Sequence, residues 1–348
     1  MRQQVAKLAG VSEATVSRVL NGVGPVKEET KQRVLAAAAE LGYVPSALAQ
    51  RFARKKSGNL GVVLPYMAKV SLFSTYYFSE MLGGIGSEAQ ARGNDLLLLF
   101  RGTDQPRDYA ALFQAQKVDA LVILGARDMS LDRLALEELA RDGHPFCVLN
   151  QRYAKRGETP PFPTIDADHW SGSREAVRHL IDIGCQRVAF INGPADYSNS
   201  ADRRDGYLSI VEQSGLPVDE RLMLTGNYSR KSGYELAPQL AEMIAAGQAD
   251  AIFAANDRMA IGAMQGLRER GLEAGRDYAL CGYDDADAAR MACPQLTSVA
   301  VPFHEMGRAA AEMLLAAADG EERAAAASAE LPVRLIVRES TGQYKPQA

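Results

Sequence analysis

The sequence predicts an α/β protein in which a small all-helical head precedes a two-lobed body built on parallel sheets. Residues 1–57 show only the helical spacing of apolar residues, and apolar runs of strand length begin at residue 59. From there such runs alternate with helical patterns, as in a parallel sheet covered by helices. The alternation restarts after about residue 165, which indicates two similar lobes.

Charge is distributed unevenly along the 348 residues. Residues 1–57 contain ten Lys and Arg against four Asp and Glu, so this segment carries +6. Because the whole chain carries −4, the remainder carries −10. A basic head on an acidic body fits a nucleic-acid-binding module attached to a domain that does not bind nucleic acid.

The head is predicted to contain three helices, at about 2–9, 13–20 and 28–41. Gly10 can adopt the positive φ of a tight turn, and Ser12 can cap the second helix. Helix, glycine turn and helix form a helix-turn-helix, whose second helix enters the major groove of DNA. A short hinge helix is expected at about 46–54, before a charged linker.

The body, residues 58–348, is predicted to repeat one pattern twice. The first unit has strands at 60–64, 95–100, 119–124 and 146–149, and helices near 76–92, 107–116 and 131–142. The second has helices near 169–183, 201–214, 231–246 and 258–270, and strands near 187–191, 221–225, 250–254 and 278–281. We assign 58–165 and 290–320 to the first lobe, and 166–289 and 321–342 to the second. Because open α/β sheets bind ligands beyond the carboxyl ends of their strands, a small-molecule site is expected between the lobes.

Other features narrow the function. The four cysteines lack CxxC spacing, which indicates free thiols in a reducing compartment. No apolar run approaches the ~18 residues of a membrane span, and the first residues lack a signal-peptide core, so a cytoplasmic protein without a membrane partner is expected. The four histidines form no metal-ligand pattern, and the GxGxxA run at 84–89 falls inside a predicted helix. No cofactor, metal site or enzymatic activity is predicted.

Several motifs in register resemble the LacI/GalR family of bacterial transcription regulators. They are Val5–Asn21 and Arg33–Pro45 in the head, and Phe253–Gly262, Gly282–Asp285, Pro294–Val299, Glu305–Arg308 and Val337–Gly342 in the body. The resemblance implies a repressor that binds double-stranded operator DNA as a homodimer or a tetramer. It also implies a body similar to periplasmic sugar-binding proteins and a small-molecule effector, best a mono- or disaccharide, with a purine or other metabolite as the alternative. A cytoplasmic sugar-binding protein or an enzyme is the less favoured interpretation.

The resemblance assigns DNA contacts to the head. The expected residues are Ser12, Glu13, Ala14, Thr15, Ser17, Arg18, Asn21, Lys27, Ala49 and Phe52. Glu13, Ala14 and Arg18 are expected to face base edges, and an arginine suits bidentate contact with guanine. The short polar side chains suit phosphate contacts, which position without specifying. Lys27 replaces the usual Ser or Thr cap of the third helix, and Phe52 stands where the family has a leucine that wedges into the minor groove.

The resemblance also assigns effector contacts in the body, to Asn150, Trp170, Arg203, Arg204, Asn256, Asp284 and Phe303. Asn256 and Asp284 follow predicted strands, at the strand ends where the ligand site is expected. Planar polar groups make paired hydrogen bonds to sugars, and Trp170 and Phe303 offer stacking surfaces. Surface or capping duty is the alternative interpretation, above all for Trp170 and Arg204.

Overall fold

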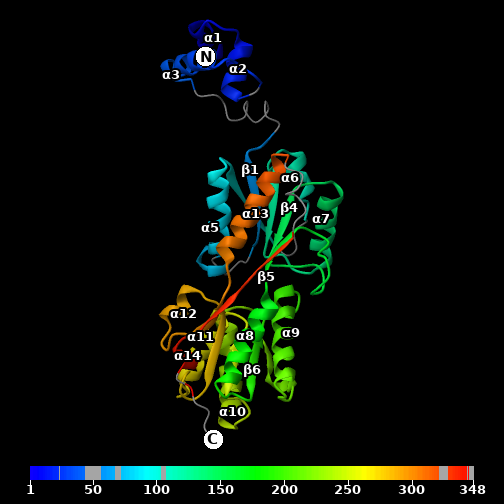
Figure 1. Cartoon of the computed structure of the whole chain (residues 1–348), viewed down its shortest axis with the longest axis vertical. Coiled ribbons are helices and arrows are strands. Elements are labelled where there is room, and N and C mark those ends of the chain that lie inside the picture. The colour runs from blue at the N-terminus through cyan, green and yellow to red at the C-terminus, as the bar shows by residue number, and fades with distance from the viewer. Residues whose placement is uncertain are drawn as a thin grey trace.

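The structure, a computed structural model, describes residues 1–22, 24–43, 56–66, 72–102, 107–320, 328–342 and 344. The described chain forms a helical head at one end of the molecule and two α/β lobes in line with it (Figure 1). Each lobe is built on a six-stranded sheet. The predicted fold class is therefore confirmed.

The head contains α1 (Arg2–Ala9), α2 (Glu13–Asn21) and α3 (Glu28–Glu40). Gly10 has φ 65° between the first two helices, and the Oγ atom of Ser12 accepts a hydrogen bond from the backbone N–H of Thr15 at 3.1 Å. Both local predictions are confirmed. No side chain caps α3, where Lys27 occupies the N-cap position. The core under the helices is small and apolar, and Val5, Val16 and Val34 are its fully buried members.

The first sheet has the strand order β11-β5-β4-β3-β1-β2, and all its pairs are parallel. Its strands are β1 (Asn59–Pro65), β2 (Asp95–Arg101), β3 (Ala120–Leu124), β4 (Phe146–Leu149), β5 (Thr164–Ala167) and β11 (Ala329–Leu331). The elements that cover it are η1 (Leu72–Ser74), α5 (Tyr76–Ala91), α6 (Ala110–Gln114), α7 (Ser130–Arg141) and α13 (Phe303–Ala318). β1 and β3 are neighbouring interior strands, and their residues are almost all buried, as expected for strands covered on both faces.

The second sheet has the order β12-β10-β9-β8-β6-β7 and is parallel except for β12, which runs antiparallel to β10. Its strands are β6 (Val188–Asn192), β7 (Met223–Thr225), β8 (Ala251–Ala254), β9 (Ala279–Asp284), β10 (Thr297–Ala300) and β12 (Arg334–Ile336). The helices of this lobe are α8 (His169–Asp182), α9 (Ser198–Gln213), η2 (Glu220–Leu222), α10 (Arg230–Ala245), α11 (Asp257–Arg268), α12 (Asp287–Met291) and α14 (Glu339–Gly342).

Helix α5 and helix α13 pack closely because glycine lies at their contact. A Cβ atom on Gly84 would overlap the carbonyl oxygen of His304, and one on Gly307 would overlap that of Met81. The GxGxxA run that begins at Gly84 is therefore a helix-packing feature, and it does not lie between a strand and a helix as a dinucleotide-binding turn must.

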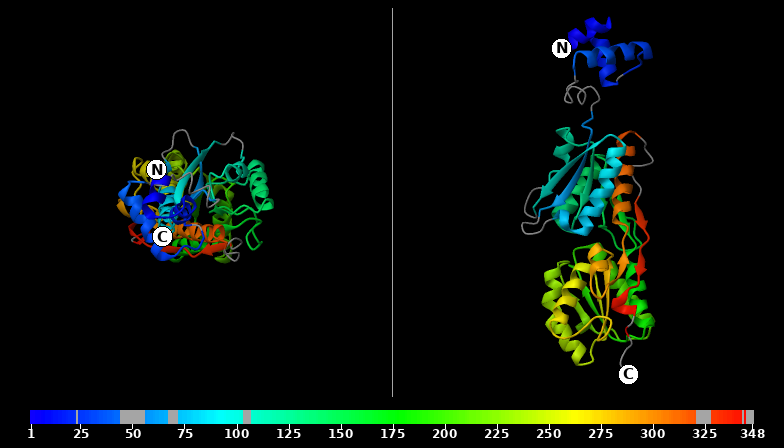
Figure 2. Two further views of the ribbon diagram at one scale, coloured as in Figure 1. Left: turned by 90° about the horizontal axis from the view of Figure 1, so that it is seen from above. Right: turned by 90° about the vertical axis from the view of Figure 1, so that its left-hand side faces the viewer.

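Sheet pairing corrects the predicted lobe boundaries at two segments. β10 lies within 290–320, which we assigned to the first lobe, yet it pairs with β9 in the second sheet. β11 lies within 321–342, assigned to the second lobe, yet it pairs with β5 in the first sheet. The chain thus passes between the lobes between β5 and α8, between β10 and α13, and between β11 and β12 (Figure 2). Strands this short carry too weak a local pattern to reveal which sheet will pair with them.

Candidate functional site

The outer face of α2 presents most of the residues that were expected to contact DNA. Val16 is fully buried against α1 and α3, so helical spacing turns Glu13, Ala14 and Arg18 outward, and all three are exposed. Ser12 and Lys27 are exposed as well. Thr15 and Ser17 are half-buried. Among the described residues the guanidinium group of Arg18 has no ion-pair partner, so it is available for an external acceptor.

Several expected DNA contacts also make hydrogen bonds within the head, among them Glu13 and Asn21. Glu13 accepts a hydrogen bond from Arg2 Nε at 3.2 Å, which ties the start of α2 to α1. Asn21 is buried, and its Nδ2 atom donates to Ser17 Oγ at 3.1 Å. The remaining two, Ala49 and Phe52, lie outside the described residues.

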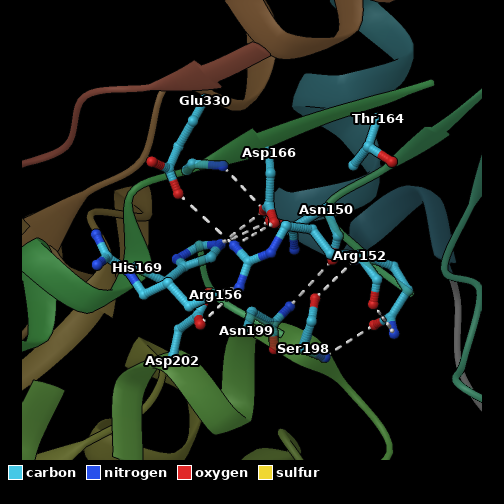
Figure 3. Close-up of polar contacts among 12 residues, drawn as sticks. Asn150, Arg152, Arg156, Thr164, Asp166, His169, Ser198, Asn199, Asp202 and Glu330 are labelled. Carbon is cyan, nitrogen blue, oxygen red and sulfur yellow. Dashed lines mark hydrogen bonds and ion pairs between the residues drawn. The ribbon is translucent and has the colours of Figure 1, made fainter. Parts of the chain in front are cut away.

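Polar side chains gather where the carboxyl ends of the two sheets meet. Asn150 follows β4 of the first sheet, whereas Asn256 follows β8 and Asp284 ends β9 of the second. The carbonyl oxygen of Asn150 accepts a hydrogen bond from Asn199 of α9 at 3.4 Å, so the two lobes are in direct contact here (Figure 3). We call this region the lobe junction.

Arg203 of α9 is the central cation of the lobe junction and is 3% exposed. Its Nη1 atom donates to the carbonyl oxygen of Ala255 at 2.7 Å, and its guanidinium carbon lies 4.0 Å from the ring centre of Tyr283. The buried Nε atom has no hydrogen-bond partner among the described residues. Because an unpaired buried donor is costly, this N–H group is a candidate contact for a bound molecule.

His169, at the start of α8, joins the two lobes within this cluster and is fully buried. Its Nε2 atom lies 2.7 Å from Asn150 Oδ1, and its Nδ1 atom lies 3.2 Å from Arg203 Nη2. An amide oxygen only accepts and a guanidinium only donates, so Nε2 carries the proton and Nδ1 accepts. Burial, with the positive charges of Arg203 and Arg152, lowers the pKa of His169 well below its ordinary value, and the ring is neutral.

Asn256 and Asp284 have different structural roles at the carboxyl edge of the second sheet. Asn256 caps α11, because its Oδ1 atom accepts from Met259 N at 2.9 Å, and its Nδ2 atom donates to the Tyr228 carbonyl oxygen at 3.1 Å. Asp284 is half-exposed and has φ 106°, a strained conformation for a residue with a side chain. Burial raises the pKa of Asp284 to about 7, against the charges of Arg203 and Arg258. The Asp284 carboxyl group can therefore accept hydrogen bonds when ionised and donate one when protonated.

Aromatic side chains of the first lobe border the lobe junction. Phe303 is buried, and its ring centre lies 5.1 Å from that of Tyr77 and 6.2 Å from that of Tyr76, both in edge-on contact. Burial raises the pKa of Tyr77, and the Asn150 side chain opposes this rise. Phe303 therefore supports the tyrosines that reach the polar cluster.

Two residues expected at the effector site do not join this group. Guanidinium groups of Arg156 and Arg174 lie over the Trp170 ring, 4.3 and 4.4 Å from its centre, so its stacking surface is already occupied. Arg204 is exposed and pairs with Asp205 at 3.5 Å. Arg203 and Arg204 are neighbours on a helix and point in different directions, which residue type alone does not reveal.

Sequence reasoning missed several members of the lobe junction, namely Tyr77, His169, Asn199, Tyr228 and Tyr283. Each lies in the first turn of a helix, in a loop or at a strand end, and of the five only Tyr283 stands in one of the family motifs, Gly282–Asp285. The start of α8 at a lobe crossing is the one signal that could have identified His169. In the described part of the chain no group of His, Cys, Asp and Glu is placed to hold a metal ion, and no helix could cross a membrane.

Known proteins share both the head and the body. A model of the bacterial regulatory proteins of the lacI family matches residues 3–46, and a periplasmic binding protein-like domain matches residues 177–341. The transcriptional regulator AscG of Escherichia coli K12 is 36% identical over 87% of each chain. The chain belongs to the lacI family. DegA of Bacillus subtilis, also a transcriptional regulator, is 31% identical over 97% of this chain and 96% of its own.

Solved structures of the family agree with the architecture over nearly the whole chain. The lac repressor dimer bound to operator and the anti-inducer ONPF has a TM-score of 0.80 at 30% identity, covering 97% of each chain. The complex of the regulator CelR with cellobiose has a TM-score of 0.73 at 30% identity, covering 98% of this chain and 99% of that one. These relatives are regulators, one bound to DNA and one to a sugar.

Proposed function

We propose that this lacI-family member is a repressor that binds a near-palindromic operator as a homodimer under the control of a small molecule. The observation that carries the proposal is the pairing, in one chain, of an exposed α2 face with a buried polar lobe junction. The α2 face exposes side chains that can reach base edges in the major groove. The lobe junction holds an unpaired Arg203 Nε atom between two lobes whose arrangement can change.

For operator binding we assign base reading to α2. Arg18 contacts guanine, while Glu13 and Ala14 determine which bases are preferred at the neighbouring operator positions. To contact a base, Glu13 must give up its hydrogen bond with Arg2. Ser12, Thr15, Ser17 and Lys27 contact phosphates, and Asn21 acts from its buried position by holding Ser17. The segment 46–54, with Ala49 and Phe52, enters the minor groove as a wedge.

For the effector we assign a mono- or disaccharide to the lobe junction. Arg203 Nε supplies a donor, the Asp284 carboxyl group an acceptor, and Asn150 a planar amide beside Tyr77. Such groups match the hydroxyl groups of a sugar. The similar CelR structure contains cellobiose, and that of a LacI-family regulator from Enterococcus faecium, 26% identical, contains ribose.

Control follows from the three chain crossings between the lobes. A ligand at the lobe junction contacts both lobes, so it favours one lobe arrangement by the difference in its affinity for the two. A coupling of about 1–3 kcal/mol is typical for such a regulator. A repressor of chromosomal genes acts in the cytoplasm, where we place this protein.

The test uses the full chain and a random duplex library. Selected sequences are expected to be near-palindromic, and fluorescence anisotropy then measures operator affinity with cellobiose, ribose or adenine present. An affinity change of about 5- to 150-fold with one sugar supports the proposal and shows whether that sugar releases or recruits the repressor. Selection of no sequence overturns the function. A response to adenine alone overturns the sugar assignment, and sedimentation separates a dimer from a tetramer.

A further inference from the structure

The Arg152 side chain connects the two lobes beside the proposed effector site. Arg152 lies in the loop after β4, and its Nη2 atom donates to both carboxylate oxygens of Asp202 in α9, at 2.6 Å each. Its Nη1 atom lies 3.1 Å from Asp166 Oδ2 in β5 and 3.6 Å from Glu330 in β11 (Figure 3). The Arg152 side chain is only 10% exposed, so these charge contacts are poorly screened.

Two further hydrogen bonds fasten the same segments. The backbone N–H of Arg152 donates to Ser198 Oγ at 2.8 Å, and the backbone N–H of Ser198 donates to Gln151 Oε1 at 3.0 Å. Residues 150–152 of the first lobe are therefore held against the first turn and a half of α9 in the second.

These segments are also the ones that carry effector contacts. Asn150 lies two residues before Arg152, and Asp202 directly precedes Arg203. Any movement that separates Arg152 from Asp202 also changes the position of Asn150 relative to Arg203. The Arg152–Asp202 ion pair and the proposed ligand contacts therefore both depend on the same relative position of the two lobes.

The distribution of carboxylates makes this contact reversible. Asp166 and Glu330 belong to strands of the first sheet, so they stay with Arg152 when the lobes separate. Asp202 leaves with the second lobe and gains water. A buried ion pair is strongly destabilising to break when it leaves an unpaired charge, but here Arg152 keeps two partners and Asp202 becomes hydrated.

We propose that Arg152 and Asp202 form an inter-lobe latch that stabilises the present lobe arrangement and positions Asn150 against Arg203. This inference rests on the proposed function, because it assigns to the latch the setting of the lobe equilibrium on which the effector acts. Arg152 is a positioning residue, since it acts through Asp202 and its own loop and does not need to touch the ligand.

The test measures the distance between the lobes in the full-length protein without DNA or small molecule. Spin labels are placed at Glu137→Cys in α7 and Glu212→Cys in α9, both exposed, in a Cys293→Ser background. Labelled chains are diluted with unlabelled protein so that a dimer carries one labelled chain, and pulsed electron resonance gives the distance distribution. Circular dichroism confirms that each variant is folded.

Asp202→Asn and Arg152→Gln are each expected to increase at least threefold the fraction of molecules outside the native distance peak. The double variant should not exceed either single change, because both remove one contact. Asp205→Asn is the matched control, since it breaks an exposed ion pair on the same helix and should leave the distribution unchanged. Arg152→Lys keeps the charge without the two-pronged geometry, so it should give an intermediate fraction. This variant replaces Asp202→Asn or Arg152→Gln as the test if either of them fails to fold.

An unchanged distribution in Asp202→Asn and Arg152→Gln overturns the latch, as do simply additive effects or an equal shift in Asp205→Asn. Operator selection with the native chain is carried out separately. A chain that selects an operator but shows no latch effect overturns this inference alone. A chain that selects no operator overturns the proposed function, while the distance measurement still decides whether the latch exists.

Discussion

The head and the lobe junction use their polar residues in opposite ways. In the head most of the proposed DNA contacts are neighbours in sequence, from Ser12 to Arg18, and most of these are exposed at α2. At the lobe junction Asn150, His169, Arg203 and Asp284 come from different elements of both lobes, and all but Asp284 are buried. Substitutions of the exposed α2 residues Ala14 and Arg18 should therefore change binding without changing stability, whereas those at the lobe junction should change both.

The largest effect is expected from Arg203→Ala. The change leaves the carbonyl oxygen of Ala255 without its Arg203 donor and removes one of the two groups that contact Nδ1 of His169, so the free energy of unfolding should fall by about 3 kcal/mol. The response of operator affinity to the effector should be lost. Urea unfolding and anisotropy measure the two, and Arg203→Lys, which keeps the charge but not the planar fork, is the control. Native stability in Arg203→Ala would show that the buried hydrogen bonds of Arg203 do not stabilise the folded protein.

Arg18→Ala should lower operator affinity by about 2 kcal/mol, or roughly 30-fold, through loss of a bidentate base contact. Its stability should stay native, because the side chain is exposed. Arg33→Ala, at an exposed arginine of α3, is the matched control and should leave sequence preference unaltered. Anisotropy with native and base-substituted operators is the measurement. Equal losses for every sequence would reassign Arg18 to phosphate binding.

His169 should make the body sensitive to acid. Its pKa is lowered in the folded state, so below pH 6.5 the unfolded chain binds more protons and stability falls by up to about 1.4 kcal/mol per pH unit. Burial raises the pKa of Asp166 and of Asp284 to about 7. The folded state therefore binds protons more readily at these two groups, and their contribution to the free energy of unfolding increases as the pH falls.

The comparison of His169→Asn with the native chain isolates the histidine, because both proteins keep the two aspartates. Urea unfolding between pH 6.5 and 5 should show native stability decreasing relative to the variant as the pH falls. If the free energies of unfolding of the two proteins changed equally with pH, protonation of His169 would not destabilise the folded state. The assigned hydrogen bonds of His169 would then be wrong.

The smallest effect is expected at the helix caps of the head. Ser12→Ala removes the acceptor for the Thr15 N–H and should cost the head about 1 kcal/mol. Lys27→Ser is the opposite change, because it supplies a cap where α3 has none, and it should stabilise by a similar amount. Amide hydrogen exchange in α2 and α3 measures both. If Ser12→Ala exchanges like the native chain, packing rather than capping holds α2.

The accuracy of the sequence predictions follows the same division. The first three helices of the head were predicted within one residue, because Gly10 and Ser12 mark the ends of the first two through local hydrogen bonds, whereas the hinge helix expected at about 46–54 lies outside the described residues. In the body the main strands were placed closely, but α9 begins at Ser198 rather than near 201, and α6 is shorter than predicted. β5, β10, β11 and β12 were not predicted, since these short strands contain polar or charged residues and lack the continuous apolar run that marked β4 and β8.

The candidate site divides in the same way. The family resemblance correctly identified five residues that lie at the lobe junction or border it, namely Asn150, Arg203, Asn256, Asp284 and Phe303. The same reasoning included Trp170 and Arg204, which have partners elsewhere, and it did not identify His169 or Arg152. A motif records the residue type, whereas the direction of a side chain depends on the elements packed around it.

The sequence by itself determined the fold class, the helix-turn-helix and the family, because periodicity, capping and motif register act over a few residues. Only the tertiary structure decided which lobe β10 and β11 join, which arginine of α9 is buried, and how Arg152 and His169 connect the lobes. Those outcomes depend on contacts between residues far apart in the chain, whose free energy exists only once both sheets are assembled.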